Sequence, residues 1–362
     1  MKILNIVGAR PNFIKIAPLM AEMNRVKGFD PVLLHTGQHY DEHMSRIFFD
    51  QLEIPQPDYN LEVGSGTNSE QVGEIIKRFD PVIQQVRPDA LLVVGDVNST
   101  VACALVASYH SIPVIHVEAG LRSFDRSMPE EINRILTDQI SDLLFVTEKV
   151  GVDNLINEGI DSRKIHLVGD VMVDSLLRHK DFSDRTSTIL DSLGLEPRQY
   201  AVLTLHRPSN VDQAQTLESI LTGISELSKE LRVVFPIHPR TKKMIREFKL
   251  DHFLESMTLL EPQPYLDMIR LMSQSRMVLT DSGGIQEETT ILDVPCLTIR
   301  ENTERPVTIE EGTNSLVGTN GSNILKVAKS ILELGRQRKK RSDLWDGKAA
   351  ERICRILLDG NL

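Results

Sequence analysis

Residues 90–119 read ALLVVGDVNSTVACALVASYHSIPVIHVEA, and the fold class can be worked out from this stretch. Two short apolar runs, at residues 90–94 and 113–117, flank a segment with helical periodicity at residues 101–109. The first of these runs is apolar at every position, which is typical of a strand that is buried on both faces of a parallel sheet. The stretch therefore predicts a strand–helix–strand unit within a parallel sheet that helices cover on both faces.

The same alternation extends outward from this unit in both directions. Further strands of a first series are expected at residues 2–7, 31–34, 143–146 and 165–168. Its helices are expected at residues 13–26, 70–86, 130–140 and 151–158. Pro81 could interrupt the second of these helices, because proline lacks the N–H that an interior turn needs.

A second series begins after the polar stretch 180–197, KDFSDRTSTILDSLGLEP, which we take as the region between two domains. Its strands are expected at residues 201–205, 233–236, 257–259, 276–280 and 296–299. Its helices are expected at residues 215–227, 240–248, 265–273, 285–292, 323–334 and 349–358. The sequence thus predicts an α/β protein with two Rossmann-like, doubly wound parallel-sheet domains, at residues 1–170 and 171–346.

Charge and cysteine content limit the function. The 362 residues include 41 Lys and Arg against 51 Asp and Glu, a formal net charge of −10. This balance argues against nucleic acid as a partner, although a local anion site remains compatible with it. Cys103, Cys296 and Cys354 are too scattered for a disulfide framework or a zinc site, which favours a cytoplasmic protein without a metal. No apolar stretch is long enough to span a membrane.

Ligands of doubly wound sheets bind at the carboxyl ends of the strands. If the two sheets face each other, the active site is expected in the cleft between the domains. The first strand is followed by residues 8–12, GARPN, and then by Lys15. Arg10 and Lys15 could bind a diphosphate beside the helix start, and a plain turn with surface cations is the alternative.

Carboxylates follow two later strands of this domain. Asp96 comes after residues 90–94 and could act in catalysis or cap the following helix. Glu118 comes directly after residues 113–117, where a carboxylate could transfer a proton or could form a buried ion pair with Arg122. Glu130 and Glu131 follow Pro129, and acids at this place are also typical of an ordinary helix start.

The strand ends of the second domain carry different chemistry. His206 follows residues 201–205, and Arg305 lies past a later strand. Ser282-Gly283-Gly284 follows residues 276–280 and opens a helix, a pattern that could cradle a phosphate or be a simple glycine-rich turn. Glu288 lies one turn further on and could bind ribose hydroxyls. The pattern is neither GxGxxG nor a P-loop, so a dinucleotide such as NAD loses support. A nucleotide-diphosphate cleft is the interpretation that combines these features.

Nine motifs in this order resemble the non-hydrolysing UDP-N-acetylglucosamine 2-epimerase family. They are GARPNFIK, TGQHYD, GDVNST, HVEAGLR, PEEINR, LTLHRP, PIHPRT, TDSGGIQEE and TERP, and they extend along essentially the whole chain. The resemblance implies a fold of the glycosyltransferase-B type, a C-terminal helix at residues 347–362 that joins the first domain, and a homodimer. It implies a UDP-sugar substrate and no NAD or metal cofactor.

The resemblance also implies a reaction. UDP is eliminated across C1–C2 to give a 2-acetamidoglucal, a proton returns to the other face of C2, and UDP adds again. UDP-N-acetylglucosamine and UDP-N-acetylmannosamine, a precursor of cell-surface polysaccharide, are interconverted in this way. By resemblance, the catalytic residues are Asp96, Glu118, Glu130 and His206. The residues that bind UDP or substrate are, by the same resemblance or by the strand-end reasoning above, Arg10, Lys15, His206, Ser282, Gly283, Gly284, Glu288 and Arg305.

Members that a second UDP-N-acetylglucosamine activates share further residues. Gln38 and His39 match that effector site, whereas residues 66–68 and 206–209 depart from its pattern. The residues of the segments TGQHYD and RSFDRSMPEE also resemble those of relatives that act on 2,3-diacetamido uronic acid nucleotides. The motifs are also compatible with a hydrolysing 2-epimerase, a UDP-sugar glycosyltransferase or a non-catalytic UDP-sugar sensor.

Overall fold

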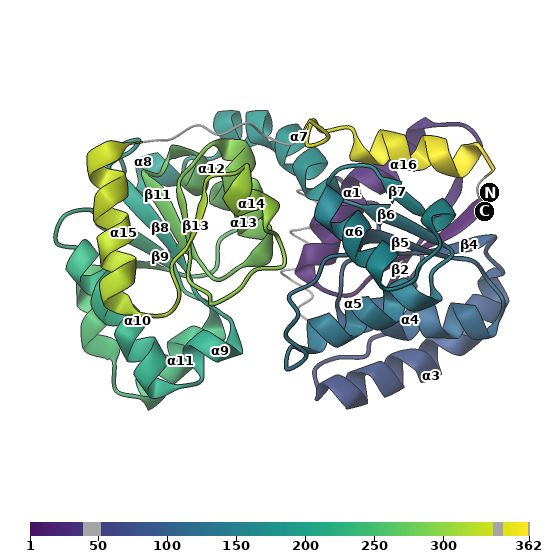
Figure 1. Ribbon diagram of the computed structural model, residues 1–362, viewed down its shortest axis with the longest axis horizontal. Helices are drawn as coiled ribbons and strands as arrows, with labels where there is room; N and C mark the ends of the chain where they lie inside the picture. The colour runs from purple at the N-terminus through teal and green to yellow at the C-terminus, as the bar shows by residue number, and fades with distance from the viewer. Residues whose placement is uncertain (39–51, 336–342, 361–362) are drawn as a thin grey trace. The chain divides into compact units, whose positions relative to one another are not determined.

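The computed structural model describes residues 1–38, 52–335 and 343–360. They form two compact units, one of Met1–Leu177 with Asp343–Leu362 and the other of Arg178–Ser342 (Figure 1). Each unit is built on its own parallel sheet with helices against it. The predicted α/β fold with two Rossmann-like, doubly wound sheets is therefore confirmed.

The described residues of the first unit contain a seven-stranded parallel sheet in the order β3-β2-β1-β4-β5-β6-β7. Its strands are β1 (Lys2–Val7), β2 (Asp30–His35), β3 (Tyr59–Asn60), β4 (Ala90–Val94), β5 (Val114–Ala119), β6 (Leu143–Val146) and β7 (Ile165–Leu167). The strand order reverses between β1 and β4, which are paired in parallel. This reversal makes the carboxyl ends of β1 and β4 the place where a ligand is expected.

Helices cover both faces of the first sheet, with α1 and α5 on opposite faces (Figure 1). They are α1 (Arg10–Arg25), α3 (Asn68–Val86), α4 (Asn98–Tyr109), α5 (Pro129–Ile140), α6 (Lys149–Asn157) and, from the end of the chain, α16 (Ala349–Leu358). Helix α16 packs against α1. Its start is capped by the Asp174 carboxylate, which accepts hydrogen bonds from the N–H groups of Ala349 (3.1 Å) and Ala350 (2.8 Å).

Helix α3 passes through Pro81 without ending, so the expected interruption is wrong. Pro81 is exposed, whereas Phe79 and Ile83 beside it are fully buried. The carbonyl that loses its partner at Pro81 can therefore turn to water, while the buried face keeps the helix in place. The helix starts at Asn68 because Thr67 and Glu70 form a capping box, in which the Thr67 N–H donates to Glu70 over 2.9 Å.

The described residues of the second unit contain a six-stranded parallel sheet in the order β10-β9-β8-β11-β12-β13. Its strands are β8 (Tyr200–Thr204), β9 (Arg232–Pro236), β10 (Thr258–Leu260), β11 (Met277–Thr280), β12 (Cys296–Thr298) and β13 (Asn314–Leu316). The longer helices against it are α10 (Ala214–Leu227), α11 (Pro239–Glu247), α12 (Tyr265–Gln274), α13 (Gly283–Leu292) and α15 (Gly321–Leu334). The order reverses between β8 and β11, the strands that precede His206 and Ser282.

The polar stretch at residues 180–197 is largely helical. Helix α7 (Val171–Thr186) starts in the first unit and ends in the second, and α8 (Ile189–Leu193) follows it. The sequence did not predict α7, because polar side chains make up part of its buried face. Buried Ser183, for example, donates a 2.6 Å hydrogen bond to the carbonyl of Leu266. In the described part of the chain, no helix is long and apolar enough to cross a membrane.

Candidate active site

The carboxyl edge of the first sheet holds a buried ion pair between Lys15 and Glu118. Lys15 comes from α1 and Glu118 from the end of β5, and the two side chains are 7% and 3% exposed. The expected alternative, an ion pair between Glu118 and Arg122, is wrong, because Arg122 instead contacts Asp138 (2.7 Å) and Glu158 (2.6 Å). The sequence predicts Lys15 as a ligand of the diphosphate and Arg122 as the partner of Glu118, whereas in the fold Lys15 is the partner of Glu118.

Glu118 has an unusual backbone. The register between β5 and β6 shifts at this residue, a β-bulge, and its φ is +73°. A residue other than glycine in the left-handed region carries strain of about 1–3 kcal/mol, and such strain concentrates at functional sites. A bulge also redirects a side chain at a sheet edge. The sequence carries no signal for this bulge, because nothing in residues 113–118, PVIHVE, differs from an ordinary strand that ends in a polar residue.

Gly95 lies directly against this ion pair, after the last residue of β4. Its φ is +66°, and a Cβ atom there would stand 2.9 Å from Lys15 Nζ and 3.1 Å from Glu118 Oε2. A side chain at this position would therefore strain the backbone and push the pair apart. The GDVNST motif needs its glycine for this close approach.

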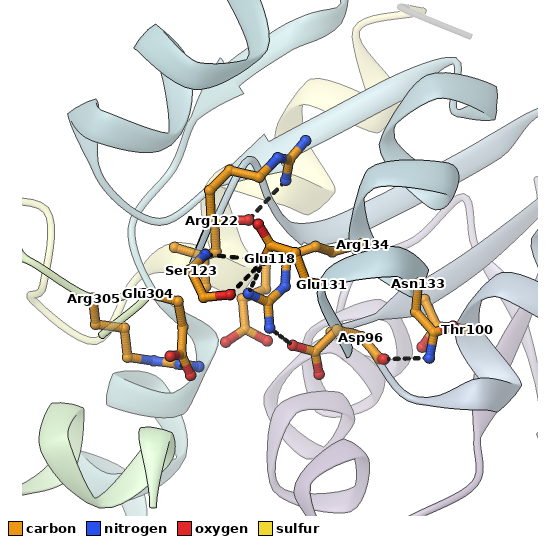
Figure 2. A network of polar contacts seen from close by, with 12 residues as sticks. Asp96, Thr100, Glu118, Arg122, Ser123, Glu131, Asn133, Arg134, Glu304 and Arg305 are labelled. Carbon is orange, nitrogen blue, oxygen red and sulfur yellow. Dashed lines mark hydrogen bonds and ion pairs between the residues drawn. The ribbon is translucent and has the colours of Figure 1, made fainter. Parts of the chain in front are cut away.

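Asp96, the next residue, contacts Arg134 from α5. Its role as a helix cap, which the sequence left open, is wrong, since α4 begins after Val97 without a side-chain cap. Figure 2 shows the buried Arg134 between Asp96 and Glu131, and the distance from Arg134 Nη1 to Glu131 is 2.8 Å. Sequence analysis missed Arg134, although it ends the PEEINR motif, because 38 residues separate it from Asp96 along the chain.

The two acids at the start of α5 have different environments. Glu131 is 1% exposed and accepts 2.9 Å hydrogen bonds from the N–H groups of Ser123 and Phe124, so it holds the preceding loop in place (Figure 2). Glu130 is exposed on the first turn of the helix. Of this pair, Glu130 has the carboxylate that faces solvent and could contact a ligand.

Three further predicted residues belong to the first unit. Arg10 is the first residue of α1, and its side chain lies outside the described part of the structure, as does all of His39. Gln38 is buried, and its Oε1 accepts hydrogen bonds from the backbone N–H (3.1 Å) and the hydroxyl (2.7 Å) of Ser99. The Gln38 side chain therefore connects the segment after β2 to the start of α4 within the fold.

In the second unit, His206 forms a dyad with Asp281 at the carboxyl edge of the sheet. The distance from His206 Nδ1 to Asp281 Oδ1 is 2.8 Å, and Asp281 also accepts from the backbone N–H groups of His206 (3.0 Å) and Arg207 (2.9 Å). Burial alone raises the pKa of Asp281, but the charge of His206 and these donors hold that pKa below its ordinary value. The ionised Asp281 thus fixes the imidazole, whose side chain is 44% exposed. Asp281 stands in the TDSGGIQEE motif, but the sequence alone carries no signal for this contact.

The Ser282-Gly283-Gly284 segment opens α13, with Ser282 as an N-cap that makes no side-chain hydrogen bond to the helix. The first N–H groups of such a helix form an anion-binding end. A Cβ atom on Gly283 would stand 2.5 Å from Arg305 Nη1 and 2.8 Å from Glu304 Oε1. Arg305 itself donates to Glu287 (2.5 Å) and Glu304 (2.6 Å). These ion pairs hold its guanidinium against the glycine turn.

Glu288 lies further along α13 and is 5% exposed. Burial raises the pKa of Glu288 to about 7, with neighbouring Glu287 adding to the rise and a hydrogen bond with Tyr265 opposing it. A carboxylate of this kind can accept hydrogen bonds from paired hydroxyl groups of a ligand and becomes better at it as it ionises. Within the described ranges, no group of three or more His, Cys, Asp or Glu side chains could hold a metal ion.

Two doubly wound sheets, each with charged side chains at its carboxyl edge, define an α/β protein of the glycosyltransferase-B type. The family model described as UDP-N-acetylglucosamine 2-epimerase matches residues 21–358. The chain belongs to this family.

Relatives in sequence and structure agree with this membership. The chain is 43% identical to the UDP-N-acetylglucosamine 2-epimerase of Methanocaldococcus jannaschii, over 99% of this chain and 100% of the relative. It is 42% identical to the UDP-2,3-diacetamido-2,3-dideoxy-D-glucuronate 2-epimerase of Pseudomonas aeruginosa, over 99% of each. The crystal structure of the M. jannaschii enzyme in complex with UDP-GlcNAc and UDP is similar with a TM-score of 0.93, over 99% of this chain and 100% of that one.

Proposed function

We propose that this protein interconverts UDP-N-acetylglucosamine and UDP-N-acetylmannosamine by epimerisation at C2. The observation that carries the proposal is the Glu118 carboxylate, buried against Lys15 on a strained bulge at the carboxyl edge of the first sheet. A side chain held in this way has a defined direction before substrate arrives, which favours proton transfer at one carbon. Family membership supports the same reaction.

The chemistry divides into two halves. A carboxylate removes the C2 proton, the C1–O bond breaks, and UDP leaves with the electron pair of that bond, so a 2-acetamidoglucal remains. An acid then protonates the opposite face of C2, and a UDP oxygen adds again to C1. Glu118, Asp96 and Glu130 are the carboxylates that we propose for these transfers. Lys15 would stabilise negative charge as UDP departs.

The second unit supplies groups suited to UDP. We propose that the N–H groups at Ser282-Gly283-Gly284 and the imidazole of His206 bind the diphosphate, together with Arg10 from α1. Glu288 would accept hydrogen bonds from the ribose hydroxyls. Arg305 would act indirectly, through the ion pairs that hold Gly283 and Glu287.

Solvent isotope incorporation tests the reaction. The protein is incubated with UDP-N-acetylglucosamine in deuterium oxide, and the sugar nucleotides are followed by NMR. We expect both epimers to appear with deuterium at C2. Recovery of only deuterium-free UDP-N-acetylglucosamine would rule out this substrate. Release of stoichiometric UDP and free N-acetylmannosamine would instead indicate a hydrolysing 2-epimerase.

A 2,3-diacetamido uronic acid nucleotide is the second candidate substrate. The nearly equal identities to the M. jannaschii and P. aeruginosa enzymes, 43% and 42%, favour neither sugar over the other. The deuterium experiment is therefore repeated with both nucleotides at equal concentration in one tube. The sugar that acquires deuterium faster is the better substrate.

Two further properties belong to the proposal, the first from the resemblance and the second from the cysteines. We propose that the protein is a homodimer, which light scattering coupled to size exclusion would measure as twice the 40.8 kDa chain mass. We also propose a cytoplasmic location, because Cys103, Cys296 and Cys354 are all free and buried. Fractionation of cells that express the tagged protein tests that location.

A further inference from the structure

A buried carboxylate spans both sides of the Glu118 bulge. Asp138, on α5, is 0% exposed. Its Oδ1 accepts a 2.7 Å hydrogen bond from Nδ1 of His116, two residues before Glu118. Its Oδ2 accepts a 3.1 Å hydrogen bond from the N–H of Gly120, two residues after Glu118. One side chain thus connects the chain on the two sides of the catalytic candidate.

His116 extends this connection to the neighbouring strand. Its Nε2 lies 2.9 Å from the carbonyl oxygen of Gly95, the residue that packs against the Lys15–Glu118 pair. Both ring nitrogens of His116 face acceptors, so each nitrogen can donate a hydrogen bond when it carries a proton. His116 is 0% exposed, which keeps these contacts away from water.

The bulge turns the side chain of Glu118 to the other face of the sheet from that of His116. In a regular strand, residues two apart point to the same face of the sheet, so Glu118 would share the face of His116. His116 contacts Asp138 on α5, whereas Glu118 contacts Lys15 on α1, and α1 and α5 lie on opposite faces of the sheet (Figure 1). The left-handed backbone of Glu118 produces this reversal. Asp138 binds the chain on either side of the reversal.

We propose that Asp138, acting through His116 and Gly120, is a positioning residue that directs the Glu118 carboxylate toward Lys15. The inference rests on the proposed function of Glu118. It adds that contacts of Asp138 with the residues around Glu118 set the direction of proton transfer. An ordinary buried ion pair would stabilise the fold and leave the reaction rate of the folded protein unchanged. The two roles therefore predict different kinetics.

Asp138→Asn is the first variant. An amide at this position cannot accept from both His116 and Gly120 with its nitrogen, so one side of the bulge loses its partner. We expect kcat per UDP-binding site to fall at least 30-fold, while KM and the Kd for UDP stay within threefold of the original protein. The number of UDP-binding sites, titrated by calorimetry, removes any contribution of unfolded protein. An unchanged kcat per site would overturn the proposal.

His116→Asn and His116→Gln form a matched pair that remains informative if Asp138→Asn fails to fold. The asparagine amide can replace Nδ1 and keep the bond to Asp138, whereas the glutamine amide can replace Nε2 and keep the bond to Gly95. We expect His116→Asn to retain at least fivefold more kcat than His116→Gln. Equal rates, or a faster glutamine variant, would contradict a role that depends on Asp138.

Glu158→Gln is the control. Glu158 contacts Arg122, which also contacts Asp138, but its side chain is 28% exposed at the outer end of this cluster. We expect this change to lower the melting temperature while leaving kcat per site within twofold of the original protein. A loss of kcat as large as that of Asp138→Asn would indicate that any damage to the cluster slows the reaction, and would overturn the proposal.

A crystal structure of Asp138→Asn separates this proposal from the proposed function. We expect the ion pair between Lys15 and Glu118 to be broken in it. If the original protein epimerises neither UDP-sugar and the ion pair is nevertheless lost, the proposed function fails and the positioning role stands. If the ion pair persists, the positioning role fails, whatever the original protein catalyses.

Discussion

The carboxyl edges of the two sheets differ in backbone strain and in the exposure of their polar side chains, although the two folds are similar. In the first unit, charged side chains are buried in pairs, and the backbone is strained at Glu118. In the second unit, a helix start and a dyad of His206 with Asp281 present donors toward solvent. Buried ion pairs are present at both edges, since Arg305 contacts Glu287 and Glu304 in the second unit. A strained backbone at a buried carboxylate therefore marks the edge suited to proton transfer, whereas partly exposed donors mark the edge suited to holding an anion.

Glu118→Gln in the first unit is expected to have the largest effect on this contrast. The amide keeps the size of the side chain but cannot take up a proton from C2. We expect kcat to fall by about 10²–10⁴-fold, the usual contribution of a positioned acid or base. Calorimetry should give an unchanged Kd for UDP. A large loss of UDP affinity would mean that the Glu118 carboxylate also contributes to nucleotide binding, and would contradict its assignment to proton transfer alone.

His206→Asn tests the second edge. The amide can keep the hydrogen bond to Asp281 but lacks Nε2, the ring nitrogen on the side away from that carboxylate. We expect kcat/KM to fall about 100-fold, as when one donor to a developing anion is removed, and the melting temperature to stay the same. Rates equal to those of the original protein would exclude the imidazole from contact with the diphosphate.

Glu288→Ala should separate binding from chemistry. Loss of hydrogen bonds to a charged carboxylate corresponds to about 10–100-fold weaker UDP binding, and kcat should fall much less. A reduced kcat with unchanged affinity would contradict the ribose assignment.

The pH dependence of UDP binding is a second test of whether Glu288 binds the ribose. Because the pKa of Glu288 is raised to about 7, its carboxylate becomes a full acceptor only as the pH rises through about 7. We therefore expect UDP affinity to increase as the pH rises through this value, relative to Glu288→Gln, in which this position cannot titrate. Parallel pH curves for the two proteins would exclude Glu288 from the ribose site.

The smallest effect on the reaction is expected at Asp174, which caps α16 far along the chain from the catalytic candidates. Burial raises the pKa of Asp174 from 3.8 to about 6. The stability that its protonated form contributes is present below about pH 4 and is lost as the pH rises through about 6. Between about pH 4 and about pH 7, the free energy of unfolding of the original protein should therefore fall by about 2 kcal/mol relative to that of Asp174→Asn. Urea unfolding at about pH 4 and about pH 7 measures this difference, and an identical difference at both pH values would contradict it.

Much of the fold could be predicted because strands of parallel sheets leave a local signal. The run from Ala90 to Val94 is apolar throughout, and the structure has β4 over those same residues. Helix α7 was missed because its buried face is made partly of polar side chains such as Ser183. The predicted interruption at Pro81 was wrong because the tendency of proline to break helices takes no account of the buried side chains on either side of it.

The candidate site shows the same division. Asp96 and Glu118 could be found because polar residues directly after apolar strands must lie at the sheet edge. Their partners could not, since Lys15 lies 103 residues before Glu118 and Arg134 lies 38 residues after Asp96. Asp281 was visible in its motif, yet only the dyad with His206 gives it a function.

The two parallel sheets, the strand ends that carry charge and the resemblance to the 2-epimerase family could all be read from the amino-acid sequence. These are properties of short segments, where hydrophobic periodicity and residue type act over a few positions. Which charges pair, and which way Glu118 points, became known only from the folded chain. Pairing of buried charges depends on distances between remote segments. The direction of Glu118 depends on one backbone angle at a bulge in β5, where residues on either side contact Asp138 of α5.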